Sequence, residues 1–250
     1  MDFLSGILLG FTLVLTRVGA FFSVFPLFGW KVIPMRLKVA MILVAGIFFS
    51  SQVECPVRPQ DVFGLQSILM MINEAIYGLG LGLVCALLFL AVQVSARIVE
   101  QEMGLSMANV FDPFSGDQAE SLSVLSETVF ALLFLSVGGH HVLLRLVQQS
   151  FVRYPVGSIP DIGRLTQGLI EASNAMLLLG LQMAGPIVAV SMLTLVILAI
   201  MSKIAPEANV LFLSFPLRIG MGMIMVGIFF PFLRYFVSAY MTWLDKLLPL

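Results

Sequence analysis

Long apolar runs separated by short polar links dominate the pattern of this chain. Four of them extend over about 31 to 35 residues each: Val62–Ala96, Leu122–Val152, Leu169–Met201 and Val210–Tyr240. As one continuous α-helix, such a run would be roughly 46 to 52 Å long, whereas the hydrocarbon core of a bilayer is roughly 30 Å thick. Half of such a run would be too short to span a bilayer.

Glycine or proline interrupts each of these runs near its middle. The interruptions are Gly78, Gly80 and Gly82 in the first run, Gly138-Gly139 in the second, Ala184-Gly185-Pro186 in the third, and Gly220 and Gly222, between Pro216 and Pro231, in the fourth. They predict kinked helices or helical hairpins whose turns lie in an apolar setting. Backbone groups in such turns need cover from protein or a water-filled cavity, so we expect partner subunits around the chain. Long tilted helices with glycine kinks remain an alternative.

Two shorter apolar stretches precede these runs. Ile7–Phe28 covers about 22 residues, or roughly 33 Å of helix, which is enough to cross a bilayer. Val39–Ser51 is about 13 residues long and too short to span. The basic residues Lys31, Arg36 and Lys38 lie between the two stretches, and the positive-inside tendency places this link in the cytoplasm.

Ionisable residues lie inside the apolar runs, where a charge facing lipid is costly. Arg17, near the middle of its stretch, is expected to face protein or water, and a structural role with a carboxylate partner and a role in transport are both open. We predict that six such residues form buried charges or subunit contacts: Arg17, Glu74, Glu127, Arg145, Glu171 and Arg218.

The longest polar interruption, Arg97–Ser121, contains five carboxylates together with a string of apolar residues that includes Met107, Phe111 and Phe114. Gly104, the Asp112-Pro113 step and Gly116 disfavour a continuous helix there. We interpret the stretch as a structured central loop at about 97–121. An ordinary extramembrane connection is the alternative.

The composition sets the class of protein. The chain has 250 residues, of which 60% are hydrophobic and 11% are charged, whereas a soluble domain has roughly 25% charged residues. We therefore expect a single integral membrane domain over 1–250, in contact with membrane lipid. The net charge of -1 leaves no basic surface for nucleic acid.

Catalytic and metal-binding motifs are missing from the sequence. His140 and His141 are adjacent, so on a helix they point about 100° apart and are poorly placed to share one metal ion. The chain has no zinc-protease motif, Walker A motif, dinucleotide fingerprint or nucleophile elbow. We predict no enzymatic activity, no cofactor and no metal.

Several local patterns, in order along the chain, resemble FliR, the export-gate subunit of bacterial flagellar type III secretion. They are Arg17-Val-Gly19 with Pro26 and Pro34-Met-Arg36; Gln101-Glu-Met-Gly104-Leu-Ser-Met-Ala108 with Asp112-Pro113; Gly139-His140-His141 with Gln149-Ser150-Phe151, Pro155 and Gly157; and Lys203-Ile-Ala205-Pro206-Glu-Ala-Asn209-Val210 with Phe215-Pro216-Leu217-Arg218 and Gly220. The chain departs from the family pattern at Glu207, where glutamine is common, and at Arg218, where lysine is common.

This resemblance implies an all-α membrane protein of kinked helices and helical hairpins, forming part of a hetero-oligomeric helical export gate in the bacterial inner membrane at the flagellar basal body. Implied partners are the P and Q gate subunits (FliP and FliQ), with FlhB and FlhA, and unfolded flagellar export substrates. The family's gate is plugged by a loop of the R subunit, which maps onto Gly104, Met107, Val110, Phe111, Asp112, Pro113, Phe114 and Gly116.

Two other functions remain as alternatives. Broken helices and buried charges also suit a self-contained secondary transporter, although the two halves of the chain show no convincing inverted repeat. The equivalent subunit of a virulence injectisome is the second alternative.

Overall fold

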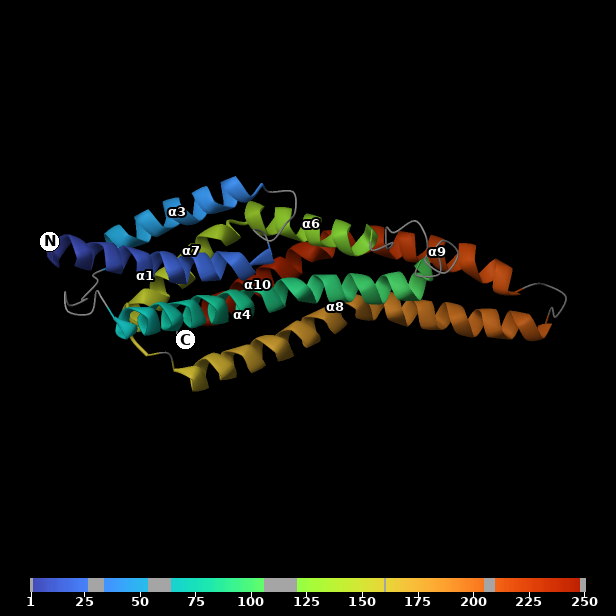
Figure 1. Cartoon of the computed structure of the whole chain (residues 1–250). Helices are drawn as coiled ribbons and strands as arrows, with labels where there is room; N and C mark the ends of the chain where they lie inside the picture. The colour runs from blue at the N-terminus through green and yellow to red at the C-terminus, as the bar shows by residue number, and fades with distance from the viewer. Residues whose placement is uncertain are drawn as a thin grey trace. The chain divides into compact units, whose positions relative to one another are not determined.

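A computed structural model of the chain describes residues 2–26, 34–53, 64–105, 121–159, 161–204 and 210–247 (Figure 1). Within these ranges, every regular element is helical. In chain order they are α1 (Asp2–Val24), α3 (Met35–Gln52), α4 (Leu65–Met103), α6 (Ser121–Ser136), α7 (Gly139–Arg153), α8 (Ile162–Ile204), α9 (Val210–Phe229), the 3-10 helix η3 (Phe230–Phe232) and α10 (Leu233–Leu247). The all-α fold predicted from the sequence is confirmed.

The helices suit a membrane. Within the described residues, five helices are long and apolar enough to cross one, and a sixth span results if α6 and α7 are counted together. The prediction of an integral membrane protein is therefore confirmed.

Two of the four long runs are broken, as predicted, and each change falls on a glycine or proline that the sequence singled out. The second run breaks between α6 and α7, where Gly138 has a φ of +83°, a left-handed conformation that favours glycine. The fourth run changes at η3, which contains Pro231. Of the positions singled out in that run, Pro216, Gly220 and Gly222 lie inside helix α9. Glycine only weakens a helix, whereas proline removes a backbone donor.

The other two runs form continuous helices, so neither is a helical hairpin, and the kinks that the sequence predicts for them stay predictions. Helix α4 has 39 residues and contains Gly78, Gly80 and Gly82, and α8 has 43 residues and contains Pro186. Proline within an apolar helix is tolerated where neighbouring groups satisfy the backbone carbonyl that it leaves without a donor. These helices are roughly 58 and 65 Å long, well beyond the bilayer core.

Helix α3 is longer than the apolar stretch that predicted it. It begins at Met35, after Pro34, and its 18 residues include Arg36 and Lys38. The predicted stretch began at Val39 because only apolar residues were counted, which excluded Arg36 and Lys38. The alkyl stems of these two side chains can lie along apolar surface. The expectation that this segment is too short to span was therefore wrong.

The chain divides into two compact units. Unit 1 comprises Met1–Leu88, Gly138–Asn174 and Met241–Leu250, and unit 2 comprises Phe89–Val137 and Ala175–Tyr240. Helices α4 and α8 contribute one part to each unit. The single functional domain expected from the sequence stays a prediction.

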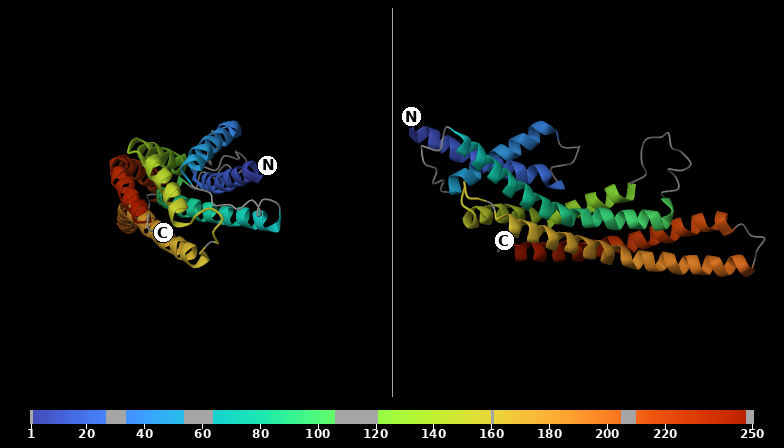
Figure 2. Two further views of the ribbon diagram at one scale, coloured as in Figure 1. Left: turned by 90° about the vertical axis from the view of Figure 1, so that its left-hand side faces the viewer. Right: turned by 60° about the horizontal axis from the view of Figure 1, so that its bottom comes forward.

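Close helix packing builds unit 1, in which α1 and α3 lie side by side (Figure 2). Gly78 and Gly82 of α4 face the backbone of α1: a Cβ at Gly78 would overlap the carbonyl oxygen of Arg17, and one at Gly82 would lie 2.7 Å from that of Phe21. The two glycines therefore let α4 approach α1 more closely than any side chain would allow, as in small-residue interfaces of membrane helices.

Aromatic and aliphatic packing builds unit 2. The ring of Phe89 in α4 meets the rings of Phe130 and Phe134 in α6 and of Tyr240 in α10 edge-on, at centroid distances of 5.1, 5.5 and 5.8 Å. A second cluster, around Val99 and Met103 of α4, joins α8 and α9. Both clusters pack the part of α4 from Phe89 to Met103 against other helices of unit 2.

We predict that replacing Gly78 with alanine destabilises the protein by about 1–3 kcal/mol, because the new methyl group meets backbone that cannot rotate away. The midpoint of thermal unfolding in detergent measures the effect. Gly220→Ala is the control, because no heavy atom of a neighbour lies within 4 Å of a Cβ built there. Equal stability of the two variants would contradict the proposed packing role.

Candidate functional site

A buried ion pair lies at the centre of unit 1. The Arg17 side chain in α1 is 1% exposed, and its Nε donates to Oε2 of Glu74 in α4 at 2.5 Å. Nη1 of Arg17 donates to the backbone carbonyls of Ser150 and Tyr154 at 3.1 and 3.0 Å. The sequence leaves two roles open for Arg17, a structural role with a carboxylate partner and a role in transport. The structure shows the carboxylate partner, Glu74.

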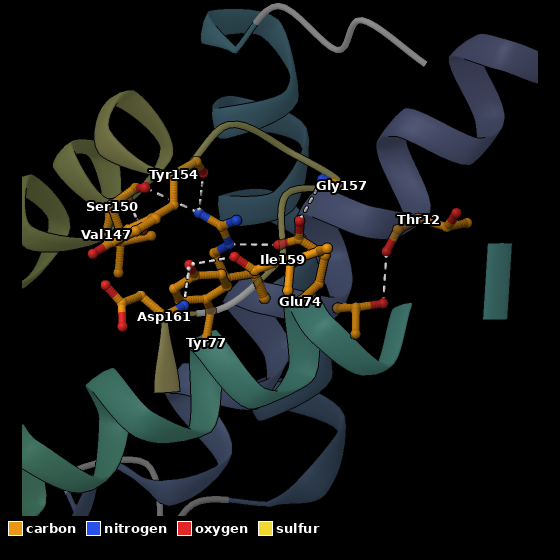
Figure 3. A network of polar contacts seen from close by, with 11 residues as sticks. Thr12, Glu74, Tyr77, Val147, Ser150, Tyr154, Gly157, Ile159 and Asp161 are labelled. Atoms are coloured by element: carbon orange, nitrogen blue, oxygen red, sulfur yellow. Dashed lines mark hydrogen bonds and ion pairs between the residues drawn. The ribbon is translucent and has the colours of Figure 1, made fainter. Parts of the chain in front are cut away.

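The same network holds the link between α7 and α8 (Figure 3). Oε1 of Glu74 accepts the backbone N–H of Gly157 at 2.8 Å, and Gly157 has a φ of +83°. The Tyr77 hydroxyl accepts the N–H of Asp161 at 3.2 Å and donates to the carbonyl of Ile159 at 3.3 Å. One turn of α4 therefore holds the middle and the end of this link, while Arg17 holds its start at Tyr154.

Two aromatic rings flank the guanidinium of Arg17. Its Cζ lies 4.4 Å from the ring centroid of Phe151 and 5.0 Å from that of Tyr77. Rings in this position stabilise a desolvated cation through their quadrupoles, in addition to the carboxylate. The partners of Arg17 come from α4, α7 and the link that follows α7, so its charge joins these three segments to α1. This geometry is that of a structural site.

The remaining charges predicted to be buried are placed differently. Arg145 and Glu171 are exposed, and Glu171 accepts a hydrogen bond from Gln167 at 3.1 Å. Glu127 and Arg218 are half-buried and belong to unit 2. Among these six residues, Arg17 and Glu74 form a salt bridge with each other. Roles of these residues in subunit contacts stay predictions.

The central polar stretch begins later than predicted. Arg97–Met103 is the end of helix α4, and the helix ends before Gly104, whose φ is +75°. The expected start of a loop at Arg97 was wrong, because polarity was taken as the boundary although no glycine or proline occurs before Gly104. Of the predicted plug residues, Gly104 is described, whereas Met107, Val110, Phe111, Asp112, Pro113, Phe114 and Gly116 lie outside the described residues.

Two carboxylates at the end of α4 bind neighbouring elements of unit 2. Glu100, 6% exposed, accepts the N–H groups of Leu122 and Ser123 at 2.7 and 3.0 Å and so caps the start of α6. A carboxylate at this position pairs orphan donors and the positive end of the helix dipole. Glu102 accepts a hydrogen bond from the hydroxyl of Ser191 in α8 at 2.6 Å.

The geometry gives no support for metal chemistry in the part of the chain that the structure describes. No three His, Cys, Asp or Glu side chains there are placed to hold a metal ion. The rings of His140 and His141 are exposed at the start of α7, with centroids 4.0 Å apart.

Sequence reasoning did not identify three parts of these sites: the hydroxyl of Tyr77, the amide of Gly157 and the capping role of Glu100. A glycine two residues after Pro155 signals a turn, but only the fold shows that its N–H points at Glu74. The partners of Glu100 are 22 and 23 residues away in the chain, beyond the reach of helical periodicity.

An all-helical membrane protein with internally compensated charges is thus the class that the fold and sites define. The sequence model of the family "Bacterial export proteins, family 1" matches residues 8–243. The chain is 32% identical over 219 residues to the flagellar biosynthetic protein FliR of Bacillus subtilis (strain 168), covering 86% of this chain and 84% of that protein. FliR of Buchnera aphidicola subsp. Baizongia pistaciae (strain Bp) is 29% identical over 215 residues (86% and 83%), and FliR of Escherichia coli (strain K12) is 26% identical over 222 residues (89% and 84%).

The chain belongs to family 1 of the bacterial export proteins, to which it is matched over nearly its whole length. Its relatives are named for flagellar biosynthesis, and the family for export. These findings indicate a component of the flagellar export apparatus.

We predict that Glu74→Gln lowers the free energy of unfolding by about 3–5 kcal/mol, because it leaves the buried Arg17 guanidinium without a counter-charge. Thermal unfolding in detergent is the measurement. Arg164→Gln is the matched control, since it breaks an Arg–Asp pair whose side chains are 53% and 48% exposed, and such pairs contribute about 0–1 kcal/mol. Similar losses of unfolding free energy in the two variants would show that the buried pair stabilises the fold no more than an exposed pair does.

Proposed function

We propose that this chain is a non-enzymatic core subunit of the flagellar type III protein export gate. In this role it helps to form, and to plug, the pore through which unfolded flagellar proteins cross the bacterial inner membrane. FliP and FliQ are its proposed neighbours in the gate, and FlhB and FlhA are further partners at the flagellar basal body. The family membership and the similarity to FliR proteins support this proposal.

The observation that carries the proposal is a mismatch between the helices and lipid. Helix α8 has 43 residues, and large apolar side chains remain exposed along much of it, from Ile170 (57%) to Ile204 (77%). A straight helix of this length exceeds the bilayer core by a factor of about two, so lipid alone cannot cover it. Sister subunits of similar apolar character would cover the remainder, as in a gate built from several membrane chains.

Helix α3 supports the same conclusion in unit 1. Val44, Ile47 and Phe48 are 67%, 59% and 57% exposed, whereas Gly46 and Phe49 on the opposite side are buried. The helix therefore has one face against its own chain and one apolar face directed outward. Lipid or a neighbouring subunit would cover the outward face.

The plugging role rests on the two anchored ends of the central loop. Because Glu100 binds the amides of Leu122 and Ser123, the chain that leaves α4 at Gly104 returns to the same end of that helix at α6. Met and Phe can close a pore there, since their contacts are non-directional and separate without breaking fixed pairs.

If the chain is a gate subunit, it should purify from membranes together with small membrane proteins in a fixed ratio and should lose solubility in detergent when they are removed. Affinity purification followed by mass spectrometry and size-exclusion chromatography measures both properties. A stable monomer that binds a small solute would overturn the gate proposal and favour a secondary transporter.

We predict that a triple variant with Met107, Phe111 and Phe114 replaced by alanine raises ion leak through the idle gate, because the apolar plug loses most of its contact area. Membrane conductance of cells that express the variant is the measurement. The control replaces Met223, Phe232 and Tyr235, three exposed large residues outside the loop, and should leave conductance unchanged. Equal conductance of the triple variant and the wild type, at equal protein level, would reject the plug.

A further inference from the structure

A small cavity, with a mostly apolar lining and a few polar side chains, lies at the end of helix α4 in unit 2. Its volume is about 10 Å³, and its lining includes Glu102 of α4, Ser191 and Thr194 of α8, and Arg218 of α9. A cavity of roughly this size holds one water molecule when two to four polar groups face it. The rest of the lining is apolar and includes Met221 and Met225.

Helix α9 approaches the end of α4 along one face. A Cβ at Gly222 would overlap the side chain of Met103, and the ring of Phe215 lies 3.7 Å from the position of a Cβ at Gly104. Arg218 is three residues after Phe215 and four before Gly222, so it belongs to the same face of α9. Its charge is thereby directed at the last turn of α4.

That turn is electrostatically suited to a cation. The final carbonyl groups of a helix carry the negative end of its dipole, and the Glu102 carboxylate adds a full negative charge. Within the described residues, Glu102 receives one donor, the neutral Ser191 hydroxyl, whose single proton is shared with the carbonyl of Val188 at 2.8 Å. Nε of Arg218 is buried without a hydrogen-bond partner among the described residues.

A buried donor and a carboxylate facing one water-sized cavity satisfy each other when a water molecule bridges them. We propose that Glu102 and Arg218 form a water-bridged ion pair across this cavity, which makes Arg218 a positioning residue that holds α9 against the end of α4. The central loop leaves α4 two residues after Glu102. Any effect of this ion pair on pore closure rests on the proposed plugging function. The existence of the pair does not depend on that function.

A double-mutant cycle on the full-length chain tests the pair, with Glu102→Gln, Arg218→Gln and the double variant compared by thermal unfolding in detergent. Either single change leaves one charge without its partner, so each should lower Tm. The double variant removes both charges together, and its Tm loss should fall short of the sum of the single losses by at least about 2 °C. Glutamine keeps hydrogen-bonding atoms at each position, which limits the change to charge.

The control pairs Glu102→Gln with Arg234→Gln, an exposed arginine of α10, and these losses should add. Additive losses in the Glu102 and Arg218 cycle would overturn the proposal. A large loss from Arg218→Gln together with none from Glu102→Gln would also overturn it, and would assign Arg218 to a carboxylate on a partner subunit.

Conductance of the same variants separates this proposal from the plug. If the pair positions the loop, Arg218→Gln raises ion leak and the double variant leaks less than either single variant. The ion pair would be retained and the plug rejected by the following combination of results: the Tm losses of Glu102→Gln and Arg218→Gln are not additive, and conductance stays at the wild-type level in these variants and in the triple loop variant.

Discussion

Compensation of charge inside an apolar protein is the constraint on which this structure depends. Arg17 lies in the middle of a helix that otherwise suits a bilayer, and an arginine left facing lipid would cost about 2.5–3.5 kcal/mol on insertion scales. The chain avoids this cost by bringing Glu74, two backbone carbonyls and two aromatic rings around one guanidinium. These groups come from α1, α4, α7 and the link that follows α7. Satisfying one charge therefore fixes the relative positions of four segments in unit 1.

The close approach of α1 and α4 and the ion pair support each other. Gly78 faces the carbonyl oxygen of Arg17 itself, one turn after Glu74 on the same helix. A larger residue at this position would separate the two backbones and lengthen the path between guanidinium and carboxylate. In a membrane, where helices gain little from hydrophobic burial against one another, small residues and polar contacts are the means by which a particular pairing is selected. Both means are used here within five residues of α4.

The sequence allowed the class of protein and the helical fold to be predicted, because both depend on composition and on the apolar runs, whereas for Arg17 it left a carboxylate partner and a role in transport both open. The length of the runs and the cost of an isolated arginine were sufficient for these conclusions. Predictions of where helices break were less successful, and the reason is physical. Gly78 and Gly82 form a GxxxG pair, so in the sequence they fit close helix packing as well as an interruption, because glycine permits both a turn and a close approach. Only contacts with α1 distinguish the two uses. The same applies to Glu100, whose capping of α6 depends on the return of the chain after a long connection.

Polar and apolar groups have separate tasks in this chain. Directional contacts gather where helices end and links begin: Glu74 at the α7–α8 link, Glu100 at the start of α6, and Glu102 at the end of α4. The outward surfaces of α3 and α8, by contrast, carry exposed Val, Ile, Leu and Phe. Hydrogen bonds to charged groups fix geometry because they demand defined distances and angles, whereas dispersion contacts tolerate different neighbours. In the gate that we propose, this division would let the chain keep its own links in place while its apolar faces adapt to lipid in one part and to unlike protein chains in another.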